Sequence, residues 1–240
     1  MDEISDDQRW WLQQVRDGYA IQLEYPVLPK LRRLPYRPIN KMIAGIISGH
    51  ANRYEALLSD FQKFNANFAE ISDDPSNEGN SPTWRSNWMP ALDAISLYAF
   101  AAQRNAANFI EIGSGTSTTF VRQAIQDHNL RTKIISIDPH PRRDIDMIVD
   151  VGFRRPLEDA DLSIFDEVMN GDIVFFDGSH RSFQNTDVTV FFTEIVPRLL
   201  ETPNVLVGVH DVFLPYDYPQ DWLRRHYNEQ YRTRPRWVAL

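Results

Sequence analysis

The sequence predicts an α/β fold, in which a Rossmann-like, doubly wound and mostly parallel sheet follows an N-terminal helical extension. From residue 90 onward, short apolar runs alternate with segments of helical pattern, which is typical of βαβ units and a parallel sheet. The runs are nearly continuous in apolar residues, as expected for strands that are covered on both faces. The first run leads through two glycines into a helical segment, and such a turn is common in this fold class.

Residues 1–89 are expected to form the extension and residues 90–240 the α/β domain. The expected elements of the extension are a short amphipathic helix over 6–18, an extended connector over 25–38, a long helix over 39–71 and a loop over 72–82. The connector contains four prolines at a spacing that excludes a helix. The long helix follows from apolar residues three and four positions apart, which would give it one buried face.

In the domain, a helix is expected from Pro90, a residue accepted in the first turn, to about residue 107. The expected strands are 108–112, 133–137, 151–154, 172–176 and 204–209. The expected helices between and after them are 117–128, 143–149, 160–169, 184–200 and 219–230. Only residues 236–240 remain for any further strand of the sheet.

The segment Phe109–Phe120 indicates a loop that cradles a nucleotide. It differs from the dinucleotide fingerprint Gly-x-Gly-x-x-Gly/Ala, because its third small position is occupied by Thr118. An acid, Glu111, stands two residues before Gly113, the first glycine of the turn. A Gly-x-Gly pattern also occurs in ordinary turns between a strand and a helix, so the loop alone leaves the ligand open.

Asp138 ends the second apolar run, at about the distance from the glycine turn that is expected for a ribose-binding carboxylate. A carboxylate at this position can accept two hydrogen bonds from a ribose diol. It could also cap a helix that begins at Pro139, and both roles are compatible with one position in the fold. The sequence therefore favours a nucleoside-binding carboxylate at Asp138.

Polar residues also gather where two later strands end. Asp177 follows a buried run and leads through a glycine to His180, whereas His210 and Asp211 end the next run. Ligands of open parallel sheets bind outside the carboxyl ends of the strands, so these side chains are expected to meet at one edge. Each has a structural alternative: Asp177 could cap a helix or hold the turn, His180 could be a solvated loop residue, and His210 could be a half-buried, hydrogen-bonded histidine.

Together, the Glu-x-Gly-x-Gly turn, the acid after the second strand and the Asp-Gly-Ser-His and His-Asp segments resemble class I S-adenosylmethionine (SAM)-dependent methyltransferases, of the family that includes the macrocin-type sugar O-methyltransferases. The resemblance covers roughly residues 90–230 and implies a SAM-binding domain. The residues that it implies for the cofactor are Glu111 near the ammonium group, Gly113, Ser114 and Gly115 in the loop, Asp138 at the ribose hydroxyls, and Asp177.

The same resemblance implies a divalent metal and a general base. Its metal ligands would be Asp177 and Asp211, and the base would be His180. The sequence has His210 where these relatives have a second acid, so His210 is expected either as a third ligand or as a second catalytic residue that assists proton transfer. Mg²⁺ prefers oxygen ligands, and an imidazole suits Mn²⁺ or Fe²⁺ better; a site without metal is the third alternative.

In the related enzymes the N-terminal region covers the active site, so the extension is a candidate cover. Trp84 and Trp88 could then line an acceptor pocket, or they could pack in the core of the extension. Residues 214–219 could form a loop on the substrate side or a proline-rich turn. Residues 155–159 are expected near the adenine, and Asp187 as a surface or capping residue.

Composition limits the classes of protein and partner. The net charge of −8 argues against a nucleic-acid binder with a broad basic face. Cysteine is absent, which excludes disulfides and thiolate metal sites, and no apolar run is long enough to span a membrane. The acidic start of the chain is unlike a signal peptide, so we expect a cytoplasmic protein.

The sequence thus predicts a SAM-dependent O-methyltransferase that acts on a hydroxyl of a small molecule, such as a sugar or natural product, with help from a divalent metal. The expected partner is the small-molecule acceptor, without nucleic acid or membrane, and the protein could form a homo-oligomer. Because fold does not fix function, two alternatives stay open: a SAM-fold protein with a non-methylating reaction, and a non-catalytic binding protein.

Overall fold

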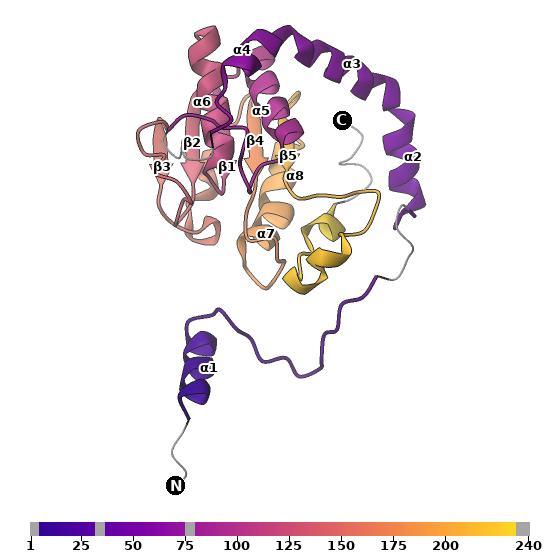
Figure 1. The fold of residues 1–240 in the computed structure, drawn as a ribbon, viewed down its shortest axis with the longest axis vertical. Helices are drawn as coiled ribbons and strands as arrows, with labels where there is room; N and C mark the ends of the chain where they lie inside the picture. The colour runs from indigo at the N-terminus through magenta and orange to yellow at the C-terminus, as the bar shows by residue number, and fades with distance from the viewer. Residues whose placement is uncertain (1–4, 32–36, 75–79, 234–240) are drawn as a thin grey trace.

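The fold is a five-stranded parallel sheet covered by helices (Figure 1). The computed structural model describes residues 5–31, 37–74 and 80–233. The strand order is β3-β2-β1-β4-β5, with every neighbouring pair parallel. This arrangement confirms the predicted Rossmann-like α/β fold. Residues 236–240, which were left for a further strand, lie outside the described residues.

The strands are β1 (Asn108–Ile112), β2 (Lys133–Ile137), β3 (Val151–Phe153), β4 (Ile173–Phe176) and β5 (Leu206–Val209). The α-helices are α1 (Asp6–Arg16), α2 (Lys41–Gly49), α3 (Ala51–Phe61), α4 (Asn65–Glu70), α5 (Ala91–Arg104), α6 (Thr116–His128), α7 (Asp187–Val190) and α8 (Val196–Leu199). Short 3₁₀ helices occupy Gln62–Phe64, Leu157–Asp159, Leu162–Phe165, Gln220–Arg225 and Glu229–Arg232, and a π-helix occupies Phe191–Ile195.

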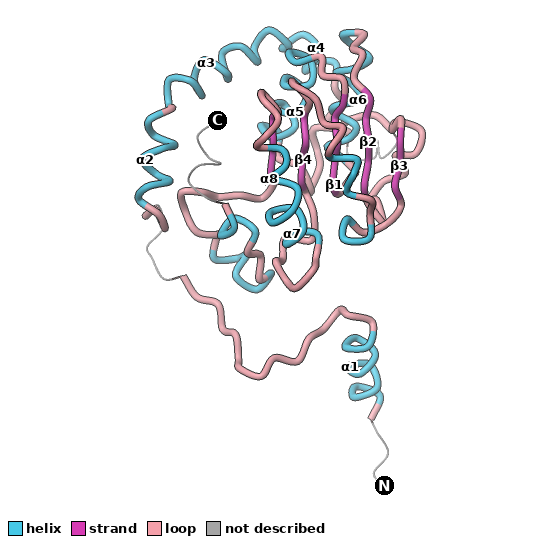
Figure 2. The backbone as a smooth tube through the Cα atoms, turned by 180° about the vertical axis from the view of Figure 1, so that it is seen from behind, coloured by secondary structure: helices cyan, strands magenta, loops and turns pink. Residues whose placement is uncertain are grey.

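The strands are apolar on both faces because the sheet has a core on each side. On β1, Phe109 joins the core formed with α5 and α6, whereas its neighbour Ile110 joins the core formed with the helices between β4 and β5. Successive side chains of a strand point to opposite faces, so a run of apolar residues can serve both cores. Figure 2 shows the helices on the two sides of the strands from behind.

The predicted strands agree with the structure within two residues at their ends, but several predicted helices do not. The helix expected over 39–71 is divided at His50, where the backbone (φ −108°, ψ 12°) leaves the helical region after Gly49. The helix expected over 184–200 contains the π segment, which precedes Pro197; proline lacks the N–H that an α-helix needs and crowds the preceding turn.

Three further helix predictions were wrong or incomplete. Residues 143–149 form only a single turn, in which Val149 N–H donates to Ile145 O. One turn fixes several torsions for few hydrogen bonds, so a segment this short does not sustain a helix by itself. Residues 160–169 contain one short 3₁₀ helix, and residues 219–230 are split into 3₁₀ pieces at His226, whose φ is 56°.

The N-terminal extension divides into a part that stands away from the body and a part that belongs to the core. Helix α1 has no buried residue and stands apart from the body in both views, and the exposed segment up to residue 31 leads from it back toward the body (Figures 1 and 2). In contrast, Phe61, Ile71 and Met89 are buried, and Phe68 and Trp84 pack on the core beside α5 and α6. Among the described residues, no helix is both long and apolar enough to cross a membrane.

Candidate active site

The turn after β1 approaches the end of β4 so closely that only glycine fits at its first position. Gly113 has φ +79°, and its N–H donates to Ile137 O at 3.1 Å. A Cβ atom at Gly113 would lie 1.8 Å from the backbone oxygen of Asp177. The glycine therefore lets the turn pack against the strand end that carries Asp177, which joins two of the predicted site segments.

Glu111 stabilises this loop through a hydrogen bond with Thr118. It is fully buried, and the Thr118 hydroxyl donates to its Oε2 at 2.5 Å while accepting from Gly115 N–H at 3.0 Å. Burial raises the pKa of Glu111 to about 7, although hydrogen bonds from Ser117 and Thr118 lower it. Glu111 Oε1 has no hydrogen-bond partner among the described residues. Glu111 thus acts on the loop through Thr118, and its proposed contact with the cofactor ammonium stays a prediction.

We expect the stability of the protein to fall as the pH rises from about 4.5 to about 7 because of Glu111. In this range the unfolded state loses the proton that the folded state keeps, so folding becomes less favourable. Glu111→Gln should remove this dependence and change the free energy of unfolding, relative to wild type, by up to ~3 kcal/mol between pH 5 and pH 8. Urea unfolding at both pH values checks this, with the exposed Glu70→Gln as control; parallel pH profiles for wild type and Glu111→Gln would contradict it.

Asp138 holds the other side of the glycine loop. Its two carboxylate oxygens accept hydrogen bonds from Ser114 N–H at 2.7 Å and from His140 N–H at 2.8 Å. The Ser114 hydroxyl also lies 2.7 Å from that of Ser136 on β2. Each carboxylate oxygen can accept a second hydrogen bond, so the structural role and the predicted ribose contact are compatible.

A cavity of about 390 Å³ opens beside the glycine loop. Its walls include Ser114 and Gly115 from the loop, Asp177 from the end of β4, and Trp88 and Arg142, whose guanidinium carbon lies 4.2 Å from the Trp88 ring centre. The volume is within the range of small-molecule pockets. The cavity joins three of the predicted cofactor residues, whereas Glu111, Gly113 and Asp138 do not line it.

Of the two tryptophans, Trp84 packs in the core and Trp88 lines the cavity, and the loop predicted near the adenine does not reach the cavity wall. Trp84 packs in the core between Phe68 and Phe120, and its indole N–H donates to Phe68 O. Trp88 instead lines the cavity. The segment 142–144 after β2 forms part of the cavity wall, whereas residues 155–159, expected near the adenine, do not line it.

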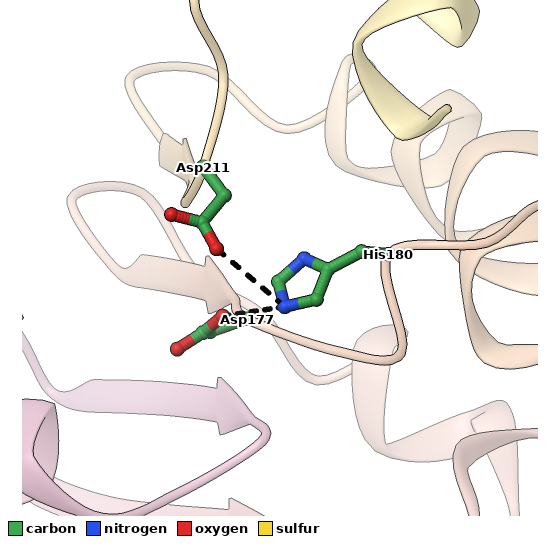
Figure 3. A group of neighbouring side chains, drawn as sticks. All are labelled: Asp177, His180 and Asp211. Carbon is green, nitrogen blue, oxygen red and sulfur yellow. Dashed lines mark ion pairs between the residues drawn. The ribbon is translucent and has the colours of Figure 1, made fainter. Parts of the chain in front are cut away.

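A cluster of two acids and a histidine lies next to this cavity, at the carboxyl ends of β4 and β5 (Figure 3). His180 Nε2 lies 3.5 Å from Asp177 Oδ1 and 3.6 Å from Asp211 Oδ2. The potential ligand atoms of these three residues are all within 4.8 Å of one another, a spacing that could accommodate a metal ion. The structure therefore brings together three of the four residues predicted at this edge.

His210, the fourth residue, approaches the same acids from the other side. Its Nδ1 lies 3.4 Å from Asp177 Oδ1 and 3.4 Å from Asp211 Oδ1, and its Nε2 lies 3.2 Å from Asp93 Oδ2 on α5. Burial opposes the charged form of His210, but the carboxylates of Asp177, Asp93 and Asp211 outweigh burial and raise its pKa to about 10. Burial also raises the pKa of Asp211, and the two histidines partly offset this effect.

His180 is oriented by Glu229 and Tyr227, two residues that the sequence did not point to. Its Nδ1 lies 3.2 Å from Oε1 of the buried Glu229, which also accepts from the Tyr218 hydroxyl at 3.2 Å. The His180 ring stacks on Tyr227, with centroids 4.3 Å apart. An Nδ1–H directed at Glu229 leaves the lone pair on Nε2, on the side of Asp177 and Asp211.

The backbone conformation of His180 is unfavourable, and Asp187 stabilises the turn that leads to it. His180 has φ 63°, in the left-handed region that few residues other than glycine adopt. Asp187 holds the preceding turn, because Ser179 donates to it through both its N–H and its hydroxyl. Asp187 is the first residue of α7 rather than its N-cap, which is Thr186, and its Oδ1 also accepts from Val188 N–H.

A second, larger cavity of about 1540 Å³ is lined by Ser179 and Arg181, the neighbours of His180, and by Tyr227, which stacks on the His180 ring. Its wall combines the N-terminal segment around residues 18–30 with the loops after β4 and β5, including Leu214, Asp217 and Tyr218 from the predicted substrate-side loop. Ile39 N–H donates to Pro215 O, so the extension contacts this loop directly. The contact brings the extension to the side of the molecule where an acceptor could enter.

Comparison with known proteins agrees with this geometry. Residues 110–212 match a family described as a methyltransferase domain. The matched region contains the glycine loop, Asp138 and the Asp177, His180, His210 and Asp211 cluster. The match supports a SAM-dependent methyltransferase. Among curated proteins, none matches the chain.

Proposed function

We propose that the protein is a SAM-dependent O-methyltransferase that methylates a hydroxyl of a small molecule, such as a sugar or natural product. The observation that carries the proposal is the position of Asp177, which lines the cavity at the glycine loop and also lies 3.5 Å from His180 Nε2. The larger cavity is lined by Ser179 and Arg181, the neighbours of His180, and by Tyr227, which stacks on its ring, so a methyl donor in the first cavity and an acceptor in the second would meet between Asp177 and His180. The order of the motifs supports a place near the macrocin-type sugar O-methyltransferases.

The residues around the smaller cavity suit SAM. The loop over Ser114 and Gly115 offers backbone to the methionine part. Asp138 does not line the cavity but accepts from Ser114 N–H of this loop, and it is the proposed carboxylate for the ribose diol. Asp177 brings negative charge to the wall on which a sulfonium would lie. When bound, SAM supplies the methyl group that the acceptor oxygen takes from sulfur, leaving S-adenosylhomocysteine.

His180 is the proposed general base. As the new O–C bond forms and the S–C bond breaks, the hydroxyl proton moves to His180 Nε2. Glu229 holds the ring through Nδ1, and Asp177 and Asp211 stabilise the positive charge that the ring gains. A base of this type, held near its reactant, combines proton transfer with positioning.

Asp177 and Asp211 are also placed to hold a divalent cation, for which His180 completes the group of ligand atoms within 4.8 Å and the predicted third ligand His210 lies outside that group. His210 Nδ1 has no hydrogen-bond partner among the described residues, and it lies 3.4 Å from one oxygen of each acid. A donor set of the two acids and either histidine contains nitrogen, which suits Mn²⁺ or Fe²⁺ better than Mg²⁺. A cation held there would polarise the acceptor hydroxyl.

SAM binding provides the first test. Asp138→Ala should weaken the binding of SAM by about 1–3 kcal/mol, because charged hydrogen bonds are lost. Isothermal calorimetry measures this directly. Asp150→Ala is a matched control, since Asp150 likewise accepts a hydrogen bond from a backbone N–H, that of Ile134, but at the opposite end of β2. Equal SAM affinity in Asp138→Ala and wild type would remove Asp138 from the site.

Metal removal provides the second test. Dialysis against EDTA should lower kcat on the order of 100-fold, the scale expected when a Lewis acid is lost, while SAM affinity stays unchanged. Mn²⁺ or Fe²⁺ should restore turnover better than Mg²⁺. Full turnover after EDTA treatment, in protein that elemental analysis finds free of metal, would establish a metal-free reaction.

A further inference from the structure

Three arginines line the larger cavity close to His180: Arg181, Arg224 and Arg225. Within the described part of the chain, none of them forms a salt bridge with a carboxylate. The only acidic side chain on the described wall is Asp217, which accepts a hydrogen bond from the Tyr231 hydroxyl. The net charge of the protein is −8, so a cavity wall with three arginines and one described carboxylate is locally opposite in sign to the whole chain.

The arginines are connected to His180 through Tyr227. One face of Tyr227 stacks on the His180 ring, and the guanidinium carbons of Arg181 and Arg225 lie 5.2 Å and 5.6 Å from the Tyr227 ring centre. Arg225 also lies 4.1 Å from the centre of the Trp222 ring. Cation–π contacts hold a guanidinium in place without using its in-plane N–H donors.

Arg181 is further fixed by the backbone. Its Nε–H donates to Arg225 O at 2.9 Å and its Nη1 donates to Ser179 O at 3.3 Å. A guanidinium has five N–H donors, so three of those on Arg181 have no described partner. A held fork with free donors is suited to an anionic oxygen pair, which it can bind through two parallel hydrogen bonds.

We propose that the acceptor carries a carboxylate or a phosphate beside its reacting hydroxyl, and that Arg181 and Arg225 bind this anionic group. The proposal rests on the proposed function, since it assigns the larger cavity to the acceptor. Arg224 and, from the N-terminal segment, Lys30 add positive charge to the same wall and would draw an anion into the cavity.

Matched acceptors test the proposal with labelled SAM. Methyl glucoside is compared with methyl glucuronoside and glucose 1-phosphate, and catechol with 3,4-dihydroxybenzoate, so that each neutral hydroxyl compound has an anionic counterpart. The carboxylate and phosphate arms separate the two kinds of anion. Calorimetry with glucuronate and with inorganic phosphate, in the absence of SAM, measures recognition of the anion without requiring turnover.

The variants are Arg181→Gln, Arg225→Gln and the double variant, with Arg53→Gln on the exposed face of α3 as control. We expect the anionic compounds to be preferred, and the double variant to weaken their binding by roughly 10- to 100-fold, the scale of losing a charge-assisted hydrogen bond. KM for the anionic acceptor should rise while kcat changes little, and SAM affinity should stay at the wild-type value. Arg53→Gln should behave as wild type.

Two results would overturn the inference: neutral compounds that bind as tightly as their anionic counterparts, or a double variant that binds glucuronate and phosphate as well as wild type does. Turnover of a neutral acceptor would then leave the methyltransferase assignment intact. Conversely, failure to bind SAM would refute the proposed function, and the calorimetric comparison of the anions would still decide whether the arginines form an anion site.

Discussion

Replacing His180 by Asn is expected to lower kcat by about 10²–10⁴-fold, the usual contribution of a general base. Asparagine is the appropriate substitution because His180 has φ 63°, and asparagine tolerates the left-handed region better than alanine does. SAM affinity should change little, since His180 does not line the cavity at the glycine loop. Single-turnover kinetics with labelled SAM, together with calorimetry, would separate the two effects.

His226→Asn is the matched control, because His226 is an exposed histidine on the larger cavity with φ 56°. The pH–rate profile of His180→Asn should also lose its acidic limb. His210 is the competing base, since it contacts the same two acids, but these acids and Asp93 outweigh burial and raise its pKa to about 10, which makes it a poorer proton acceptor at neutral pH. If His210→Asn abolishes turnover and His180→Asn retains it, the two roles are reversed. If both variants retain full turnover, the proton leaves through water and neither histidine is the base.

The sheet was predictable because its strands are marked by local composition. Each run is short, apolar and followed by a turn residue or an acid. Such a run is sufficient to predict a strand that is buried on both faces. The same argument placed Asp138, Asp177 and Asp211 correctly at one edge, because the carboxyl ends of parallel strands must meet there. These residues follow directly from strand positions.

Glu229 and Asp93 were not predictable in this way. Glu229 reaches His180 from a 3₁₀ helix near the end of the described chain, and Asp93 reaches His210 from the first turn of α5. Each contact joins segments far apart in the sequence, and neither acid stands in a motif. The only hint in the sequence was that Glu229 stands between two aromatic residues, Tyr227 and Tyr231. Such a position suggests a buried acid but does not identify its partner.

The failed helices have a common physical cause. Periodicity in a short segment predicts which side chains are buried, but a helix also needs enough length to offset nucleation. Ile145 and Ile148 are indeed buried, as the pattern over 143–149 required, although the backbone between them forms a single turn. The apolar pattern thus predicted the contacts of the segment with the core better than it predicted its backbone.

Gly113→Ala is expected to destabilise the fold by about 3–5 kcal/mol, combining the cost of a left-handed alanine with that of overpacking. The added Cβ would meet the Asp177 backbone oxygen at 1.8 Å, and backbone cannot rotate away as a side chain can. Urea unfolding measures the loss. SAM binding should also weaken, because relief of the clash moves the glycine loop away from the strand end that carries Asp177.

Gly171→Ala separates the two contributions. Gly171 has φ +91°, so an alanine there is strained in the same way, but a Cβ would meet no atom within 4 Å. It should therefore cost only about 1–2 kcal/mol and leave SAM binding unchanged. The difference between the two variants measures the close approach of the loop to β4, on which the proposed meeting of donor and acceptor depends. Equal stability of Gly113→Ala and Gly171→Ala would show that the loop can withdraw freely, and Asp177 would then no longer connect the cofactor cavity to His180.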